Sequence, residues 1–264
     1  MDLHLKKKRI LITGSSAGIG LAIAKEVARE GAEVIITGRE EKRLAKAKQA
    51  IEKDVSGATV NLISVDFDKK EEVDTLIETY PEVDILINNV GIFEPKPFEN
   101  IPDEDWFRFF EVNVMSGVRL SRHYFPKMLE KDWGRIIFIS SESGVQIPDE
   151  MIHYGMTKSA QLAIARGMAE LTKGTNVTVN AVLPGPTWSE GVETFVGKIA
   201  DEQGKNVEEV EKDFFKESRP TSLIQRFIEV EEVAAITAYL CSPRSSATNG
   251  APIRVDGGVV KSLA

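Results

Sequence analysis

Short apolar runs alternate with longer amphipathic segments along most of the chain. The short runs are nearly continuous in Val, Ile and Leu, which is typical of strands buried on both faces. Seven of them are predicted to be strands: residues 9–13, 33–37, 59–65, 84–89, 135–140, 177–183 and 253–255. The segments between them repeat apolar residues at helical spacing and are predicted to be helices, most clearly over 18–31, 41–53, 70–80, 103–131 and 151–173.

Alternation of strands with helices predicts βαβ units. We therefore expect an α/β fold, with a doubly wound, Rossmann-type parallel sheet of about seven strands and helices on both faces. No linker rich in Pro, Gly or Ser divides the chain, and no internal repeat of fixed period is present. Residues 1–264 are therefore expected to form a single domain.

The alternation breaks after the sixth predicted strand, over residues 184–227. This segment mixes dense charge with four aromatic residues, Trp188, Phe195, Phe214 and Phe215. Long insertions in a compact domain are usually functional lids or local helical excursions. The aromatic residues favour a substrate lid over 186–227, and the alternative is a pair of surface helices.

Composition narrows the classes of partner. With 42% apolar and 28% charged residues, the chain can bury a core without covalent staples. Its formal net charge of −8 argues against nucleic acid and anionic membranes, which both attract basic surfaces. No apolar run approaches the roughly 18 residues that a transmembrane helix needs. We expect a small-molecule substrate, and neither nucleic acid nor membrane as a partner.

The single cysteine, Cys241, excludes an internal disulfide framework and fits a reducing compartment. It lies in "AITAYLCSP", where a buried helical thiol is expected rather than a nucleophile. The N-terminal sequence lacks an apolar segment followed by a small-residue cleavage site. We therefore expect a cytoplasmic protein.

A glycine-rich turn follows the first predicted strand in "ILITGSSAGIG". Gly14, Gly18 and Gly20 would let the backbone approach a pyrophosphate and direct helix N–H groups at it. Their spacing differs from the Gly-x-Gly-x-x-Gly fingerprint of dinucleotide-binding domains. The turn predicts a nucleotide site, although glycines in a turn also serve purely steric needs.

Arg39 follows the second predicted strand, after Gly38. An acidic residue here would bind the ribose 2′-hydroxyl of NAD, whereas an arginine favours the 2′-phosphate of NADP. Arg39 therefore predicts NADP(H), with NAD(H) still possible because Glu40 and Glu41 dilute the positive field. The alternative is that Arg39 only begins a solvated helix.

Tyr154 precedes Lys158 by one helical turn in "YGMTK". The pair is either ordinary surface decoration or a proton donor with the cation that tunes it. The pentapeptide alone leaves both alternatives open.

The ordered motifs resemble those of the classical short-chain dehydrogenase/reductase family. "TGSSAGIG" resembles the TGxxxGIG turn of that family, "NNVG" its NNAG and "YGMTK" its YxxxK. "VNV", "ISSESG", "LPGPTWS" and "VDGG" follow the family pattern at the expected intervals, so that the resemblance spans residues 9–258. Val90 replaces the alanine of NNAG, and "PGPT" brings its threonine closer to the PG pair than in the family's PGxxxT.

The resemblance implies four catalytic residues, Asn113, Ser141, Tyr154 and Lys158. Tyr154 would protonate the carbonyl oxygen as hydride reaches the carbon, and Lys158 would lower the pKa of the phenol, which is about 10 when free. Ser141 would hydrogen-bond the substrate oxygen. Asn113 would anchor a water in a proton relay to Lys158.

The resemblance and the motifs also imply a cofactor site. Its residues would be Gly14, Ser15, Ser16, Gly18, Ile19, Gly20, Arg39, Asp66, Asn89, Gly91, Tyr154, Lys158, Pro184, Gly185 and Thr187. The substrate pocket would contain Glu142, Ser143, Met151 and Trp188, with Phe93, Val145 and His153 as further candidates. Glu142 could face the pocket or the far layer of the sheet. A structural role is favoured for His153, because one residue turns it about 100° from Tyr154 on a helix. No metal centre is expected.

Two functions of the enzyme class remain open. We rank a small free ketone, aldehyde or secondary alcohol first, and reduction of 3-oxoacyl chains on acyl carrier protein second. Asp132 and Thr175 stand where reductases of carrier-bound chains typically have basic residues, although Lys131 and Arg135 lie nearby. A non-catalytic NADP-binding sensor is the alternative from another class. The apolar surface of the predicted helices 103–131 and 151–173 leads us to expect a homodimer or homotetramer.

Overall fold

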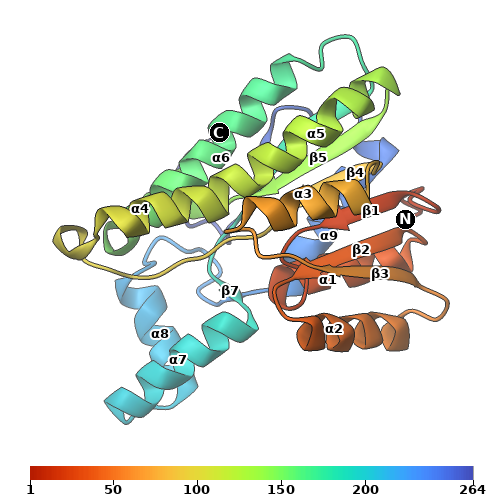
Figure 1. Ribbon diagram of the computed structural model, residues 1–264. Helices are drawn as coiled ribbons and strands as arrows, with labels where there is room; N and C mark the ends of the chain where they lie inside the picture. The colour runs from red at the N-terminus through yellow and green to blue at the C-terminus, as the bar shows by residue number, and fades with distance from the viewer. Residues whose placement is uncertain (264) are drawn as a thin grey trace.

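The computed structural model describes residues 1–263, apart from the side chain of Phe195. In this part of the chain, seven parallel strands form one sheet in the order β3-β2-β1-β4-β5-β6-β9 (Figure 1). The strands are β1 (Arg9–Ile12), β2 (Glu33–Gly38), β3 (Thr59–Ser64), β4 (Ile85–Asn88), β5 (Gly134–Ile139), β6 (Val177–Pro184) and β9 (Pro252–Val255). Each coincides with a predicted run to within two residues, so the predicted doubly wound sheet is confirmed.

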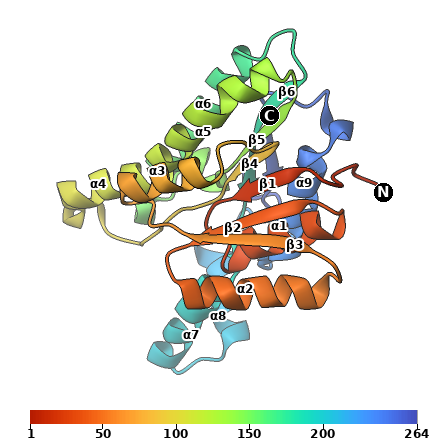
Figure 2. The same ribbon diagram turned by 45° about the vertical axis from the view of Figure 1, so that its right-hand side comes forward.

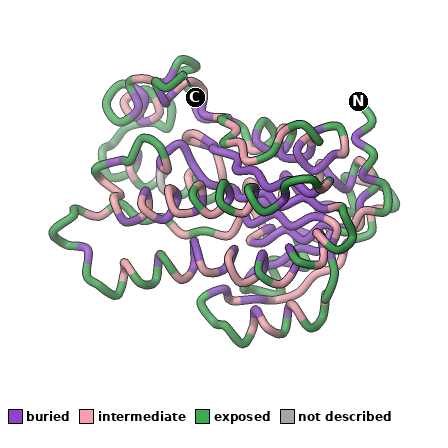
Figure 3. The backbone as a smooth tube through the Cα atoms, turned by 90° about the horizontal axis from the view of Figure 1, so that it is seen from above, coloured by how far each residue is buried: buried purple, intermediate pink, exposed green. Residues whose placement is uncertain are grey.

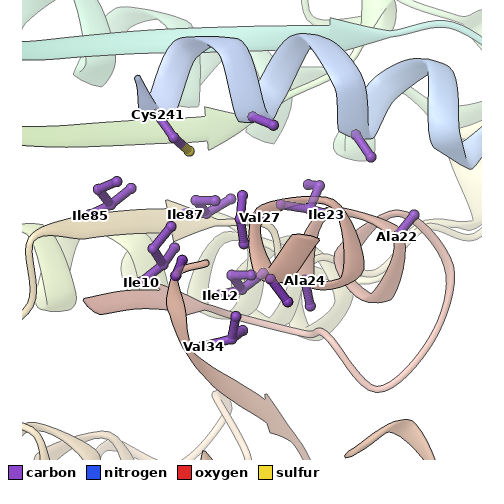
Figure 4. Packing of buried hydrophobic residues seen from close by; sticks show 14 of the residues in the cluster. Ile10, Ile12, Ala22, Ile23, Ala24, Val27, Val34, Ile85, Ile87 and Cys241 are labelled. Carbon is purple, nitrogen blue, oxygen red and sulfur yellow. The ribbon is translucent and has the colours of Figure 1, made fainter. Parts of the chain in front are cut away.

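Helices cover both faces of the sheet (Figures 1 and 2). One layer contains α1 (Gly18–Arg29), α2 (Glu41–Asp54) and α9 (Val230–Cys241), and the other contains α3 (Lys70–Thr79), α5 (Ser116–Glu130) and α6 (Ile152–Glu170). Each layer has its own apolar core against the sheet, and the strands form the buried centre of the molecule in Figure 3. Cys241 lies in the first core (Figure 4), where burial raises the pKa of its thiol to about 12, as expected for an inert buried cysteine.

The segment 103–131 is not one regular helix as predicted. It consists of α4 (Asp103–Phe110), a π-helical turn (Glu111–Met115) and α5. A π turn inserts one extra residue per turn and is frequent at functional sites. Apolar periodicity alone does not reveal such an insertion, since the flanking helices keep their pattern.

The segment after β6 forms α7 (Glu190–Gln203) and α8 (Val207–Glu217), which project from the body in Figures 1 and 2. Ser189 caps the start of α7, and Asn206 with Glu209 forms a capping box on α8. The segment has a small core of its own that includes Val196, Val210 and Phe215. Two short strands, β7 (Thr187–Trp188) and β8 (Ile228–Glu229), pair where it leaves and rejoins the body.

Within residues 1–263, no helix combines the length and apolar character needed to cross a membrane.

Candidate active site

The glycine turn lies at the carboxyl edge of the sheet, where β1 and β4 are neighbours and the connections diverge to opposite faces. In an open α/β sheet this crevice is the usual ligand site. Gly14 has a φ of +61°, and a Cβ on Gly20 would lie 2.5 Å from the carbonyl oxygen of Gly14. Glycine is therefore required for α1 to begin so close to β1. Ala17 provides no side-chain cap for α1, which leaves the first N–H groups of the helix available to an anion.

The residues around the turn divide into those that build it and those that line it. The hydroxyl of Ser15 is buried, donates to the carbonyl of Ile12 and accepts from the N–H of Thr37 (2.9 Å). The prediction that Ser15 binds the cofactor is therefore wrong for its side chain, which joins β1 to β2. Asn89 donates from Nδ2 to the carbonyls of Thr13 and Gly14, each at 2.9 Å, and so holds the turn from β4.

The adenosine end of the predicted cofactor site lies at the ends of β2 and β3. Arg39 is exposed, and its guanidinium makes no hydrogen bond or ion pair with any described residue. The hydroxyl of Ser16 lies beside Gly38, 3.0 Å from the position of an added Cβ. Asp66, which follows β3, accepts the N–H of Asp68 through one carboxylate oxygen. A free cation and a hydroxyl thus flank the carboxyl end of β2.

A cavity of about 430 Å³ opens beside the turn. Its walls include Ser141, Tyr154 and Lys158 from the predicted catalytic set. They also include Ile19, Asn89, Gly91, Pro184, Gly185 and Thr187 from the predicted cofactor set, and Glu142, Ser143 and Met151 from the predicted pocket set. Residues from five separate segments of the chain therefore meet at one cavity.

Lys158 is buried on the same face of α6 as Tyr154. Its ammonium donates to the carbonyl of Ile139 at 3.0 Å and lies 5.5 Å from the ring centroid of Tyr154. Burial lowers the pKa of Lys158 to about 8. The backbone of this turn is fixed by Ser140, whose hydroxyl donates to the carbonyl of Lys158 (2.9 Å).

The pKa of Tyr154 is raised to about 12, chiefly by burial. A side-chain hydrogen bond with Ser141 and the charge of Arg219 oppose the rise, whereas the charge of Glu142 adds to it. The expected lowering of this pKa by Lys158 is therefore not what the structure gives, because the Lys158 ammonium is directed to the Ile139 carbonyl. The phenol is held in its protonated form at neutral pH.

Ser141 follows β5 and caps a short 3-10 turn, Glu142–Gly144. The N–H of Ser143 donates to its Oγ at 3.1 Å. In this bond Oγ is the acceptor, so the hydroxyl proton of Ser141 is still available for donation to an acceptor in the cavity. The arrangement suits a donor to a substrate oxygen.

Asn113 lies in the π-helical turn and is buried. Its Oδ1 accepts the N–H of Ile92 (2.8 Å), and its Nδ2 donates to the carbonyl of Ile92 and to the hydroxyl of Thr157 (both 3.0 Å). The side chain thus clamps the loop after β4 to α6. The backbone carbonyl of Asn113 accepts a hydrogen bond from Gln161 Nε2 (2.6 Å).

Three pocket candidates lie outside the cavity wall. Trp188 packs against Phe227 within the core of the α7–α8 segment, so its prediction as a pocket residue is wrong. Val145 is exposed and does not line the cavity. His153 is fully buried against Phe109 (centroids 4.1 Å apart), which agrees with the structural role favoured for it.

Arg219 and Glu150 are wall residues that sequence reasoning missed. Arg219 Nε donates to Glu142 Oε1 and its Nη1 donates to Glu150 Oε1, each at 3.1 Å. Arg219 comes just after α8, 77 residues from Glu142, and belongs to no motif. Only the folded chain brings the three charges together. Glu142 lies in the cavity wall, on the side that the sequence left open.

Comparison with known proteins agrees with this geometry. A family model described as short chain dehydrogenase matches residues 8–198. The chain is 50% identical over 263 residues to an uncharacterized oxidoreductase, YvaG, of Bacillus subtilis, with 100% of both chains covered. It is 34% identical over 265 residues to 3-oxoacyl-[acyl-carrier-protein] reductase of Aquifex aeolicus, which covers 98% of this chain and 100% of that protein.

Among solved structures, L-sorbose reductase from Gluconobacter frateurii, complexed with NADPH and L-sorbose, is 31% identical. The superposition covers 100% of both chains with a TM-score of 0.93. The chain belongs to the short-chain dehydrogenase family, and it is an oxidoreductase of that family.

Proposed function

We propose that the protein is an NADP(H)-dependent oxidoreductase that interconverts a carbonyl and a secondary alcohol on a small free substrate. The observation that carries this proposal is the meeting of Ser141, Tyr154 and Lys158 at one cavity, directly beside the glycine turn. A hydroxyl donor, a protonated phenol and a buried amine are the groups that a carbonyl reduction needs around the substrate oxygen.

The residues at the carboxyl edge fit a phosphorylated dinucleotide. The uncapped start of α1 suits a pyrophosphate, and the unpaired Arg39 beside Ser16 suits a 2′-phosphate. The NADPH held by the related L-sorbose reductase supports this choice. When bound, NADP(H) supplies or accepts the hydride. Pro184, Gly185 and Thr187, which line the cavity opposite the turn, would hold its nicotinamide end.

In the direction of reduction, Tyr154 donates its proton to the carbonyl oxygen. A pKa of about 12 keeps the phenol protonated at neutral pH and therefore ready as an acid. Ser141 donates a hydrogen bond to the same oxygen and stabilises its developing charge. Lys158 would hold the nicotinamide ribose of a bound cofactor and would place its positive charge near the phenolate that forms on Tyr154. Asn113 acts as a positioning residue, because its side-chain bonds fix the loop after β4 against α6.

The segment 186–227 acts as the substrate lid. Support comes from Val192, Val196 and Ile199 of α7 and from Phe214 of α8, which form the apolar wall of the cavity. We also propose a homodimer or homotetramer in the cytoplasm. Phe107 and Phe110, one turn apart on α4, are 73% and 40% exposed, and neighbouring aromatic side chains left so open are typical of a surface that another subunit covers.

Reduction of carrier-bound 3-oxoacyl chains is the second candidate, supported by the related reductase of Aquifex aeolicus. The charges at the positions where reductases of carrier-bound chains typically have basic residues favour it less. Asp132 accepts hydrogen bonds from the backbone N–H and the Nδ2 of Asn176. Lys131 donates to Asp84 (2.7 Å), and Arg135 is buried. Cations that would dock an acidic carrier protein are therefore engaged elsewhere in this region.

Oxidation of NADPH in the presence of a panel of ketones and aldehydes tests the proposal. We expect one equivalent of alcohol for each NADPH consumed with at least one free carbonyl compound, and a lower rate with NADH. Binding of NADPH without turnover of any carbonyl compound or alcohol would indicate the sensor instead. Turnover of an acyl-carrier thioester alone would favour the second candidate.

A further inference from the structure

The wall of the cavity contains a buried ion network that none of the catalytic steps uses. Arg219 joins the end of α8 to two carboxylates: Glu142, directly after Ser141, and Glu150, in the 3-10 turn Asp149–Met151 that precedes α6. The side chains of Arg219 and Glu142 are 9% and 4% exposed. Charges buried to this degree keep much of their field, because water screens them weakly.

The guanidinium is engaged through two of its three nitrogens, and Nη2 has no partner among the described residues. Its Nε and Nη1 donate to the two carboxylates, and Nη1 also donates to the carbonyl of Ser218 (2.8 Å). The ring of Phe214 lies 5.7 Å from the guanidinium carbon. A substrate carboxylate is best bound by two parallel N–H groups of a free arginine fork. Arg219 cannot offer that fork without releasing Glu142 or Glu150.

The carboxylates outnumber the cation on this wall. Burial raises the pKa of Glu142, and the charge of Arg219 opposes this rise. With both carboxylates ionised, two negative charges face one positive charge, so an anionic substrate would meet net repulsion here. Lys158 is the other cation of the cavity, but it donates to Ile139 and is the residue assigned to the nicotinamide ribose. A bound phosphorylated cofactor adds further negative charge.

Glu142 also provides an acceptor. Its Oε1 is paired with Arg219, whereas its Oε2 is buried and has no hydrogen-bond partner among the described residues. A buried carboxylate oxygen without a donor is costly, so a substrate hydroxyl that reaches Oε2 on entering the cavity would gain a strong hydrogen bond. Glu142 lines the same cavity as Tyr154, and its charge contributes to the raised pKa of that phenol.

We propose that the Glu142–Arg219–Glu150 network makes the site selective for uncharged, hydroxyl-bearing ketones, of the ketose and polyol class, and disfavours keto acids. This inference rests on the proposed function, because it concerns the substrate of the same cavity. The remaining wall is mostly apolar, with Ile92, Val192 and Phe214, and its other polar residues, such as Ser143 and Thr187, carry no charge, so the network is the main source of discrimination by charge.

Two matched substrate pairs test the inference. L-sorbose and 5-keto-D-gluconate share the same ketone and differ at one terminal carbon, which is a hydroxymethyl group in the first and a carboxylate in the second. Methyl levulinate and levulinate differ by the same charge without the additional hydroxyls. With NADPH saturating, we expect kcat/KM to favour the uncharged member of each pair by about tenfold or more, and L-sorbose to exceed methyl levulinate.

Glu142→Gln and Glu150→Gln each remove one negative charge from the wall. We expect either variant to reduce the preference for the uncharged member by about threefold or more. Glu150→Gln is included because the Glu150 side chain is 40% exposed, so that its substitution is less prone to impair folding than that of the buried Glu142. Glu170→Gln removes an exposed carboxylate at the far end of α6 and should leave the ratio unchanged.

The outcomes of these experiments separate failure of the selectivity inference from failure of the proposed function. Equal or better turnover of the keto acids, or ratios unchanged in both wall variants, would overturn the inference while the proposed function stood. The same holds if the enzyme reduces other ketones but neither L-sorbose nor methyl levulinate. Absence of NADPH-dependent turnover with every carbonyl compound would contradict the proposed function itself, and the inference with it.

Discussion

At the scale of single residues, the site keeps ionisable groups where burial opposes their charge. Lys158 is buried beside Tyr154, and burial lowers its pKa from 10.5 to about 8. The folded state therefore binds the lysine proton less tightly than the unfolded chain does. Such a residue reduces the stability of the fold below pH 8, which is a common consequence of an active-site charge.

Lys158→Met is accordingly expected to increase the free energy of unfolding at pH 7 by roughly 1–3 kcal/mol. Between about pH 8 and pH 10.5 the unfolded wild type binds more protons than the folded one, so wild-type stability rises with pH and the difference shrinks. Urea denaturation at pH 7 and pH 10 measures both effects. Lys173→Met, at an exposed position, is the control and should change little. A less stable Lys158→Met protein at pH 7 would contradict the cost assigned to this buried charge.

Arg39 is expected to determine the preference for the phosphorylated cofactor. Arg39→Ala should raise KM for NADPH about tenfold or more and leave KM for NADH nearly unchanged, because only NADPH has the 2′-phosphate. An aspartate at position 38 is a poorer test, since its Cβ would crowd the Ser16 hydroxyl at 3.0 Å. Arg166→Ala, far from the turn, serves as the charge-matched control. Equal effects on both cofactors would show that Arg39 does not contact the 2′-phosphate.

Some site residues could be found from sequence and others could not. Ser141, Tyr154 and Lys158 lie close together in the chain, so their spacing carries information about their geometry. Arg219 belongs to no local pattern, and its pairing with Glu142 results from the end of α8 packing against the loop after β5. The sequence likewise did not predict that the Ser15 side chain points into the interior, because a hydroxyl in a glycine turn can face either side.

At the scale of elements, the strands were predictable because burial on both faces leaves continuous apolar runs. The π-helical turn was not, because it adds a residue without changing the character of the flanking helices. This turn places Asn113 where it can bond both backbone groups of Ile92. The π-helical turn therefore contributes to the site by positioning the side-chain amide of Asn113.

Asn113→Ala is expected to lower the free energy of unfolding by roughly 1–3 kcal/mol, because it leaves the partly buried N–H of Ile92 without its partner and removes one of the two hydrogen bonds of the Thr157 hydroxyl. If Asn113 positions the site, kcat should fall more than KM changes, and Asn113→Asp should not restore it. Denaturation and steady-state kinetics measure the two effects. Asn61→Ala, which loses one bond to Glu33 at the sheet edge, is the control. A stable variant with wild-type kcat would show that Asn113 does not position the site.

At the scale of the whole molecule, the alternation of strands and helices predicted the layered sheet, and the order of the strands locates the crevice between β1 and β4. The α7–α8 segment stands apart from these layers yet forms one wall of the cavity (Figure 1). Its aromatic residues indicated an insertion with a role, but Trp188 proved to be part of its internal core. Which of its side chains face a ligand depends on helix packing that no local pattern encodes.

The central claim is that Tyr154 is the proton donor of an NADPH-dependent carbonyl reduction. The most direct test is the rate of NADPH oxidation by Tyr154→Phe with a ketone that the wild type reduces, with NADPH binding followed by fluorescence. We expect the rate to fall about 100-fold or more while NADPH still binds, and Tyr239→Phe on α9 to keep the wild-type rate. A Tyr154→Phe enzyme that turns over at the wild-type rate would contradict the account.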